Sequence, residues 1–172
     1  MPVNRILLAP GASGNVGQLA RHASGLEARG FSVELVPLPR GRAERATPVY
    51  QAAVGPDAGS TVMGGQSFGG RVASLLAPDL APAALVLFSY PLHAPGRHDA
   101  WVERTAHWPQ ISCPVLLLSG ESDPFARIDL LREAVRLLPS ATLVTFAGVG
   151  HGVGGVLDEA LDAVAAFIGA NT

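Results

Sequence analysis

The sequence Gly64-Gly65-Gln66-Ser67-Phe68-Gly69-Gly70 lies between an apolar run, 61–63, and a helix-like run, 71–76. A serine within Gly-x-Ser-x-Gly, between a strand and a helix, is typical of a nucleophile elbow. This sharp turn strains the serine backbone, and the crowding strand and helix require small residues two positions before and after it. Glycines occupy both positions, so the stretch predicts a serine nucleophile at Ser67.

Short apolar runs alternate with longer amphipathic runs along the chain, and the apolar runs are nearly continuous in Val, Leu, Ile and Ala. This alternation predicts an α/β fold with a doubly wound, mainly parallel six-stranded sheet and helices on both faces. The connections 38–59 and 90–112 look irregular, with a short helix expected near 49–54. The expected strands are 3–9, 32–37, 61–64, 84–89, 115–119 and 142–146, and the expected helices are 16–29, 69–76, 128–138 and 156–168.

The composition indicates one globular domain over residues 1–172, because 48% of the residues are hydrophobic and only 15% are charged. The formal net charge is -2 and the arginines are scattered, which argues against nucleic acid or an anionic membrane as a partner. The single cysteine, Cys113, excludes an internal disulfide framework and a Cys-rich metal site. Without a recognisable signal peptide or a membrane-length apolar run, we expect a cytoplasmic location.

Loops that leave the carboxyl ends of the expected strands carry an acid and a histidine in addition to the serine. Asp123 follows the fifth expected strand, and His151 lies in a glycine-rich loop after the sixth. A serine hydroxyl needs a base to take its proton, and the imidazole needs a carboxylate to orient it. The chain order serine, acid, histidine is the order found in this class of site. We therefore expect a catalytic triad of Ser67, Asp123 and His151, with Glu121 as an alternative acid.

Acyl transfer also needs N–H donors aimed at the developing oxyanion. Phe68, the residue after the nucleophile, would supply one, and the loop after the first strand would supply the other from Ala12 or, alternatively, Ser13. Tyr90 and His93 follow the strand next to the elbow, and they are candidate lining residues of the substrate pocket. The alternative is that the loop containing them is packed by its own aromatic residues. The expected pocket residues are Ser13, Tyr90, His93 and Phe125.

The first loop also supports a second interpretation. Gly11, Gly14 and Gly17 form Gly-x-x-Gly-x-x-Gly between a strand and a helix, which resembles a dinucleotide-binding loop, and Arg40 and Arg42 could suit a 2′-phosphate. Against this interpretation, the chain lacks the Tyr-x-x-x-Lys pair of short-chain dehydrogenases and contains no lysine. Nor would a nucleotide site explain the order of the serine, acid and histidine.

The chain resembles the α/β-hydrolase superfamily over nearly its whole length, and more narrowly the small dienelactone-hydrolase-like group. In that family the equivalents of Ser67, Asp123 and His151 would form the triad. The resemblance also implies a minimal fold with no lid domain and a shallow, open site. The family's first loop usually begins with His-Gly, whereas Pro10 stands here. The matching segments are 7–12, 64–71, 88–93, 120–125 and 150–151.

These expectations combine into a serine hydrolase that cleaves a small-molecule carboxylic ester, or a thioester, through an acyl-enzyme and without a metal or cofactor. Two alternatives stay open at this point. The chain could be a binding or scaffold protein that keeps the hydrolase fold without catalysis. It could also bind NAD(P) through the loop from Gly11 to Gly17.

Overall fold

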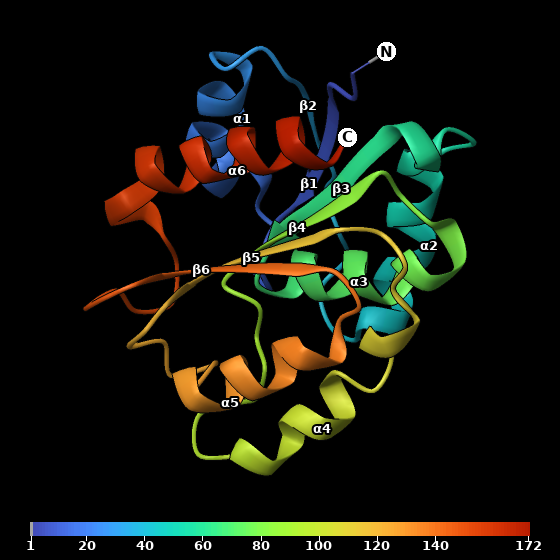
Figure 1. The fold of residues 1–172 in the computed structure, drawn as a ribbon. Helices are drawn as coiled ribbons and strands as arrows, with labels where there is room; N and C mark the ends of the chain where they lie inside the picture. Colours follow the sequence, from blue (N-terminus) through green and yellow to red (C-terminus); the bar gives the residue numbers. More distant parts are fainter. Residues whose placement is uncertain (1) are drawn as a thin grey trace.

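One parallel β-sheet runs through the centre of the molecule, and helices cover both of its faces (Figure 1). The computed structural model describes residues 2–172. All neighbouring strands pair in parallel, in the order β2-β1-β3-β4-β5-β6. The predicted six-stranded, doubly wound α/β fold is therefore confirmed. The strands are β1 (Arg5–Ala9), β2 (Ser32–Leu35), β3 (Thr61–Gln66), β4 (Ala84–Phe88), β5 (Val115–Gly120) and β6 (Ala141–Phe146).

The helices form one layer on each face of the sheet. Helices α1 and α6 lie together on one face, and α2, α3 and α5 lie on the other (Figure 1). Residues 2–172 contain no separate lid domain over the sheet edge. The helices are α1 (Ala20–Glu27), α2 (Ala43–Val54), α3 (Phe68–Leu80), α4 (Trp101–Arg104), α5 (Ile128–Ala134) and α6 (Leu157–Asn171).

The sheet separates two hydrophobic cores, and successive residues of a strand contribute to opposite ones. In β1, the Leu7 side chain belongs to the core on the side of α2, α3 and α5, whereas Ile6 and Leu8 belong to the core on the side of α1 and α6. This alternation follows from the pleat of a strand. Both faces of the inner strands are buried, so side chains at successive positions of these strands are mostly apolar. This explains the continuous apolar runs of the sequence.

Two helices are longer than the sequence indicates, and each contains a proline. Helix α2 begins at Ala43 rather than near residue 49, although Pro48 cannot donate a backbone hydrogen bond to the carbonyl of Glu44. The Thr47 hydroxyl donates to that carbonyl instead, at 3.2 Å. Helix α3 continues through Pro78 to Leu80. The connection 90–112 is built from short helical turns, including α4, around the fully buried Trp108 and Ile111.

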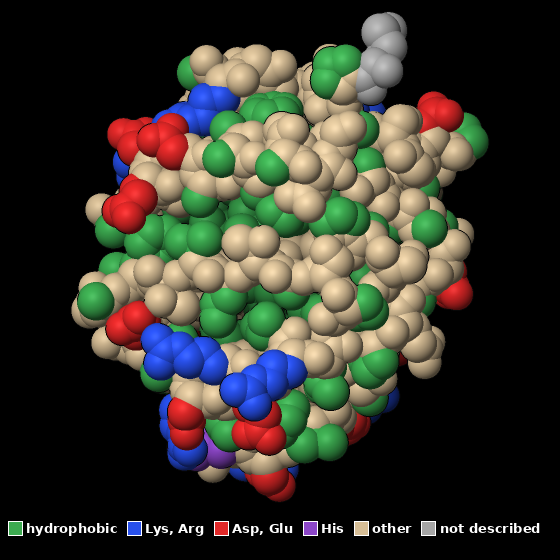
Figure 2. Space-filling view, in the orientation of Figure 1, with side chains coloured by type: hydrophobic (Ala, Val, Ile, Leu, Met, Phe, Trp, Pro, Cys, Tyr) green, Lys and Arg blue, Asp and Glu red, His purple; other side chains and the backbone are tan. Residues whose placement is uncertain are grey.

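The surface carries charges of both signs. On the face shown in Figure 2, arginine and acidic side chains lie interspersed among apolar and uncharged ones. Ion pairs join several of them, such as Arg29 with Asp162 at 2.7 Å and Arg127 with Asp129 at 2.6 Å. Within residues 2–172, no helix has both the length and the apolar character needed to cross a membrane.

The hydroxyl of Tyr50 in α2 joins the neighbouring strands β1 and β3, which lead to the candidate site. It accepts the N–H of Gly64 in β3 at 2.9 Å, and it lies 2.8 Å from the Gly64 carbonyl and 2.9 Å from the Leu7 carbonyl in β1. The Tyr50 hydroxyl has a single proton, so it donates a hydrogen bond to only one of these two carbonyls at a time. Tyr50 is fully buried, and burial raises the pKa of its hydroxyl, so the group stays neutral.

We expect Tyr50→Phe to lower the free energy of unfolding by about 1–3 kcal/mol, because it leaves buried backbone groups without their partner. Urea denaturation followed by circular dichroism would measure the change. Val49→Ala, an exposed substitution one position earlier in α2, is the matched control and should change stability by less than about 0.5 kcal/mol. Equal stability of Tyr50→Phe and the wild type would contradict this role.

Candidate active site

Ser67 occupies the turn between β3 and α3 and has an unusual backbone conformation. Its φ is +49° and its ψ is -115°, a region that residues with a side chain rarely adopt. Two hydrogen bonds hold it there: its N–H donates to the Phe88 carbonyl at 2.8 Å, and its carbonyl accepts the N–H of Arg71 at 3.0 Å. Strain of this kind costs on the order of 1–3 kcal/mol and persists where the surroundings enforce it.

Glycines make the turn possible because the backbone of β1 passes very close to it. A Cβ at Gly65 would lie 2.5 Å from the Ala9 carbonyl oxygen. A Cβ at Gly69 would overlap the same carbonyl group and that of Pro10. The requirement for glycine two positions on either side of Ser67, predicted from the sequence, thus has a specific cause in the structure.

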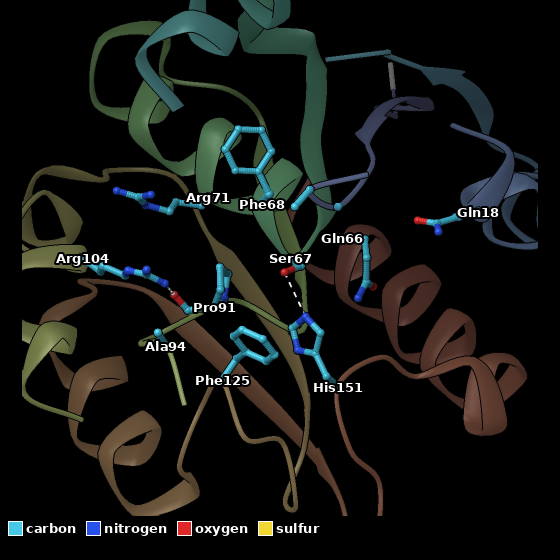
Figure 3. A pocket seen from close by; sticks show the side chains of 12 residues that line it. Gln18, Gln66, Ser67, Phe68, Arg71, Pro91, Ala94, Arg104, Phe125 and His151 are labelled. Atoms are coloured by element: carbon cyan, nitrogen blue, oxygen red, sulfur yellow. Dashed lines mark hydrogen bonds between the residues drawn. The ribbon is translucent and has the colours of Figure 1, made fainter. Parts of the chain in front are cut away.

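A chain of hydrogen bonds connects Ser67 to a histidine and a carboxylate. The Nε2 atom of His151 lies 3.0 Å from the Ser67 Oγ, and its Nδ1 lies 2.8 Å from Asp123 Oδ2 (Figure 3). A carboxylate only accepts, so Nδ1 carries the ring proton and Nε2 is free to accept the serine hydroxyl proton. The Asp123 side chain is fully buried, and its other oxygen accepts the Phe125 N–H at 2.8 Å. The alternative acid, Glu121, bonds Thr145 instead, at 2.8 Å.

The loops that carry Asp123 and His151 are hydrogen-bonded to each other. The N–H of Glu121 donates to Phe146, and the N–H of Ser122 donates to Val149, both at 2.9 Å. A Cβ at Gly120 would overlap the carbonyls of residues 149 and 150, so glycine permits this close contact. The relative position of the acid and the base therefore depends on backbone contacts between the ends of β5 and β6.

Ser89 supports the histidine loop from the end of β4, and the sequence analysis did not identify it. Its buried hydroxyl accepts the N–H of Gly152 at 3.1 Å, next to His151. Its φ is +50°, so it is a second strained serine near the site. A serine after a buried strand has no distinguishing pattern, which is why the sequence offered no signal.

A cavity of about 430 Å³ opens above the Ser67 hydroxyl. Figure 3 shows Ser67 and His151 in its middle, Phe68 and Phe125 on opposite sides, and Arg71 and Arg104 at the end away from Gln18. The sequence analysis missed both arginines. The lining residues are Gly11, Ala12, Gln18, Gln66, Ser67, Phe68, Arg71, Pro91, Ala94, Arg104, Phe125 and His151.

Of the four expected pocket residues, Phe125 lines the cavity, and the prediction is wrong for Ser13, Tyr90 and His93. The buried Tyr90 hydroxyl donates to the Arg104 carbonyl at 2.9 Å. His93 is fully buried, with Nδ1 donating to the Ala94 carbonyl at 2.9 Å and Nε2 accepting the Arg127 N–H at 3.0 Å. The Ser13 hydroxyl bonds Gln18 and Asn15. The alternative of a self-packed aromatic loop therefore describes Tyr90 and His93.

The two expected oxyanion donors, Phe68 and Ala12, both line the cavity beside the serine. The first loop approaches the serine closely, since a Cβ at Gly11 would lie 3.9 Å from the Ser67 Cβ. Neither the N–H of Phe68 nor that of Ala12 has a partner within the described part of the chain.

Comparison with known proteins agrees with this architecture. The sequence model of a family described as an alpha/beta hydrolase domain matches residues 42–158, which is more than half of the chain. The chain belongs to the alpha/beta-hydrolase family. No curated protein matches the sequence of this hydrolase domain.

Solved structures with the same fold include lipases and esterases. The monoacylglycerol lipase of Paleococcus ferrophilus has a TM-score of 0.85 and 16% identity, over 100% of this chain and 96% of the lipase. Est1E from Butyrivibrio proteoclasticus, with ferulic acid bound, has a TM-score of 0.79 and 16% identity, over 97% and 89% of the two chains. Est2 from Thermogutta terrifontis, with butyrate bound, has a TM-score of 0.73 and 17% identity, over 99% of this chain and 85% of Est2. At these identities the likeness extends to the fold alone.

In this hydrolase domain the Gly11–Gly17 loop is bonded internally. The Asn15 side chain accepts the N–H of Gly17 at 2.9 Å, where a phosphate would bind in a dinucleotide site. Arg40 donates to the Ser13 carbonyl at 2.9 Å and so serves the loop itself. Among residues 2–172, no group of three or more His, Cys, Asp and Glu side chains is arranged to hold a metal ion.

The close contact between Gly69 and β1 predicts that a side chain at position 69 destabilises the protein. Gly69→Ala should lower the free energy of unfolding by at least about 2 kcal/mol, because the added methyl group meets the rigid backbone of β1. Gly59→Ala is the matched control: its added methyl group meets nothing within 4 Å, and stability should change by less than about 0.5 kcal/mol. Chemical denaturation of both variants measures the difference, and equal values would contradict the steric account.

Proposed function

We propose that this chain is a serine hydrolase that cleaves a small carboxylic ester, or a thioester, through an acyl-enzyme. The observation that carries the proposal is the continuous hydrogen-bonded series from Ser67 through His151 to Asp123 at the floor of an open cavity. The described lipase and esterase neighbours support the ester class. A scaffold without catalysis would not need the buried Asp123 carboxylate to be aligned with the imidazole.

In the first half of the proposed reaction, Ser67 Oγ attacks the carbonyl carbon of the substrate while His151 Nε2 takes its proton. Asp123 holds the ring in the required tautomer and stabilises the imidazolium that forms. The N–H groups of Phe68 and Ala12 donate to the oxyanion of the tetrahedral intermediate. His151 then passes its proton to the leaving alcohol or thiol, and the acyl group remains on the serine.

In the second half, a water molecule attacks the acyl-serine. His151 takes a proton from the water, and the collapse of the second tetrahedral intermediate returns that proton to Ser67 Oγ. The carboxylic acid product then leaves. The cavity volume of about 430 Å³ lies in the lower part of the range for small-molecule sites, so we expect short substrates rather than long acyl chains.

A fluorophosphonate probe tests the nucleophile directly. The wild-type protein should be labelled, because the activated hydroxyl attacks phosphorus, and Ser67→Ala should not be labelled. Gel fluorescence with mass spectrometry of the labelled peptide measures this. The variant Ser74→Ala, which changes a buried serine outside the cavity lining, is the control and should keep the label. Absence of label on the wild type would count against the proposal.

The identity of the acid makes a second prediction. Asp123→Asn should lower kcat for a p-nitrophenyl ester by about four orders of magnitude, because an amide holds the imidazole in the wrong tautomer. Glu121→Gln should change kcat little, since that carboxylate bonds Thr145 and Arg132 rather than His151. Circular dichroism would establish that both variants fold. A large loss in Glu121→Gln with normal turnover in Asp123→Asn would reverse the assignment.

A further inference from the structure

Two arginines line the candidate cavity without a carboxylate to balance them. Only four of the twelve arginines form ion pairs with acidic side chains of the described chain, and Arg71 and Arg104 are among the eight that form none within 4.0 Å. These two differ from the other unpaired arginines because they line the cavity. No Asp or Glu is among the lining residues. The protein has a net charge of -2, so this positive cavity end contrasts with the balance of the whole chain.

Arg71 follows Ser67 by one turn of α3, so its position is tied to the nucleophile through the backbone bond to the Ser67 carbonyl. Its side chain is half-buried. The Nε atom is fully shielded from solvent and has no hydrogen-bond partner among residues 2–172. A buried donor without an acceptor is costly. The Nη groups of Arg71 also have no acceptor within the described chain, and unlike Nε they are not shielded, so they are the donors that a ligand in the cavity can reach.

Arg104 reaches the same end of the cavity from α4 (Figure 3). Its Nη1 donates to the Pro91 carbonyl at 2.9 Å, and its own carbonyl accepts the Tyr90 hydroxyl. These bonds hold both the guanidinium and the backbone in place. A guanidinium has five N–H donors, and only one of those of Arg104 has a partner in the described chain, so the remaining donors are available.

The neighbouring titratable groups do not neutralise this end. Burial lowers the pKa of Arg104, and the charge of Arg71 lowers it further. The same two causes lower the pKa of His107 to about 4, so this imidazole is uncharged at neutral pH and donates to Ser74 Oγ. Burial raises the pKa of Tyr90 and keeps it neutral. Glu103 is exposed and does not line the cavity. Two like charges therefore share a partly buried space, and an anion would relieve their repulsion.

We propose that Arg71 and Arg104 bind an anionic group of the substrate, a carboxylate or a phosphate, several atoms away from the carbonyl attacked by Ser67. Guanidinium groups suit this task because their planar N–H pairs match the oxygens of both anions. The inference rests on the proposed function for the role of Ser67 and narrows the substrate to an ester or thioester that carries a negative charge. The anion site itself depends only on the two arginines.

Matched ester pairs test the proposal. On the acyl side, the mono-p-nitrophenyl ester of adipic acid is compared with its methyl ester, which has the same chain without the charge. On the alcohol side, 3-carboxy-4-nitrophenyl acetate is compared with 4-nitrophenyl acetate. In at least one pair, we expect the charged ester to have a kcat/KM about tenfold or more above that of its neutral counterpart. This is the difference that one charge-assisted hydrogen bond to the added anionic group would produce. The preference should shrink when salt is raised to about 0.5 M.

The variants Arg71→Gln and Arg104→Gln should each reduce this charged-to-neutral ratio about tenfold. The ratio is the readout because a general loss of activity or folding affects both esters of a pair alike. Arg97→Gln is the matched control: it removes the same charge from an exposed position in the connection before α4, and the ratio should stay the same. If neither ester pair shows a preference for the anion, the inference is overturned while the proposed function stands.

A binding experiment separates failure of the inference from failure of the proposed function. Thermal unfolding of Ser67→Ala is followed with adipate, with neutral dimethyl adipate and with inorganic phosphate. Stabilisation by adipate or phosphate that the added Arg71→Gln abolishes would support the anion site even if no ester is hydrolysed. The comparison of adipate with phosphate identifies the preferred anion. Equal effects of the anions and the neutral diester would overturn the site.

Discussion

The close approach of the start of α3 to the end of β1 is the contact on which the rest of the candidate site depends. Gly69 lies so near the Ala9 carbonyl that a methyl group has no room, and Gly65 is crowded by the same carbonyl. With the strand and helix this close, Ser67 can join them only at a positive φ. The strain is local and small beside the burial of two cores. It places the hydroxyl at the sheet edge, in the cavity lined by the segments that follow β1, β3, β4, β5 and β6.

Asp123 and His151 lie in loops that are hydrogen-bonded to neighbouring loops. The ends of β5 and β6 share backbone hydrogen bonds that set Asp123 against His151, and the Phe125 ring lies 4.6 Å from the imidazole. From the opposite side, His93 bonds the Arg127 N–H and fastens the loop after β4 to the loop after β5. A buried imidazole in this position acts as a fixed bridge between two loops. These contacts keep His151 and Asp123 aligned in the absence of a ligand, as the proposed mechanism requires.

The positive end of the cavity depends on the same supporting residues. Tyr90 was expected in the pocket and instead lies behind its wall, where its hydroxyl holds the Arg104 backbone. An aromatic side chain in a loop can face a ligand or fill the space under the loop. Only the packing of the surrounding residues decides which of these orientations it adopts. Trp108 is fully buried and stacks edge-on against Tyr90, with ring centroids 5.0 Å apart, so the tyrosine ring is directed inward. Arg104, whose backbone carbonyl accepts the Tyr90 hydroxyl, lines the cavity, whereas Tyr90 does not.

The sequence alone was sufficient for the sheet, the elbow and the order of the acid and histidine, because each follows from a local pattern. Strands buried on both faces are mostly apolar, and the elbow needs glycine at fixed positions around Ser67. Element boundaries were less predictable, since Thr47 compensates for Pro48 and extends α2. Only the tertiary structure decided which side chains face the cavity. Arg71 and Arg104 are 33 positions apart, so their meeting point depends on how distant segments pack rather than on any pattern within either one.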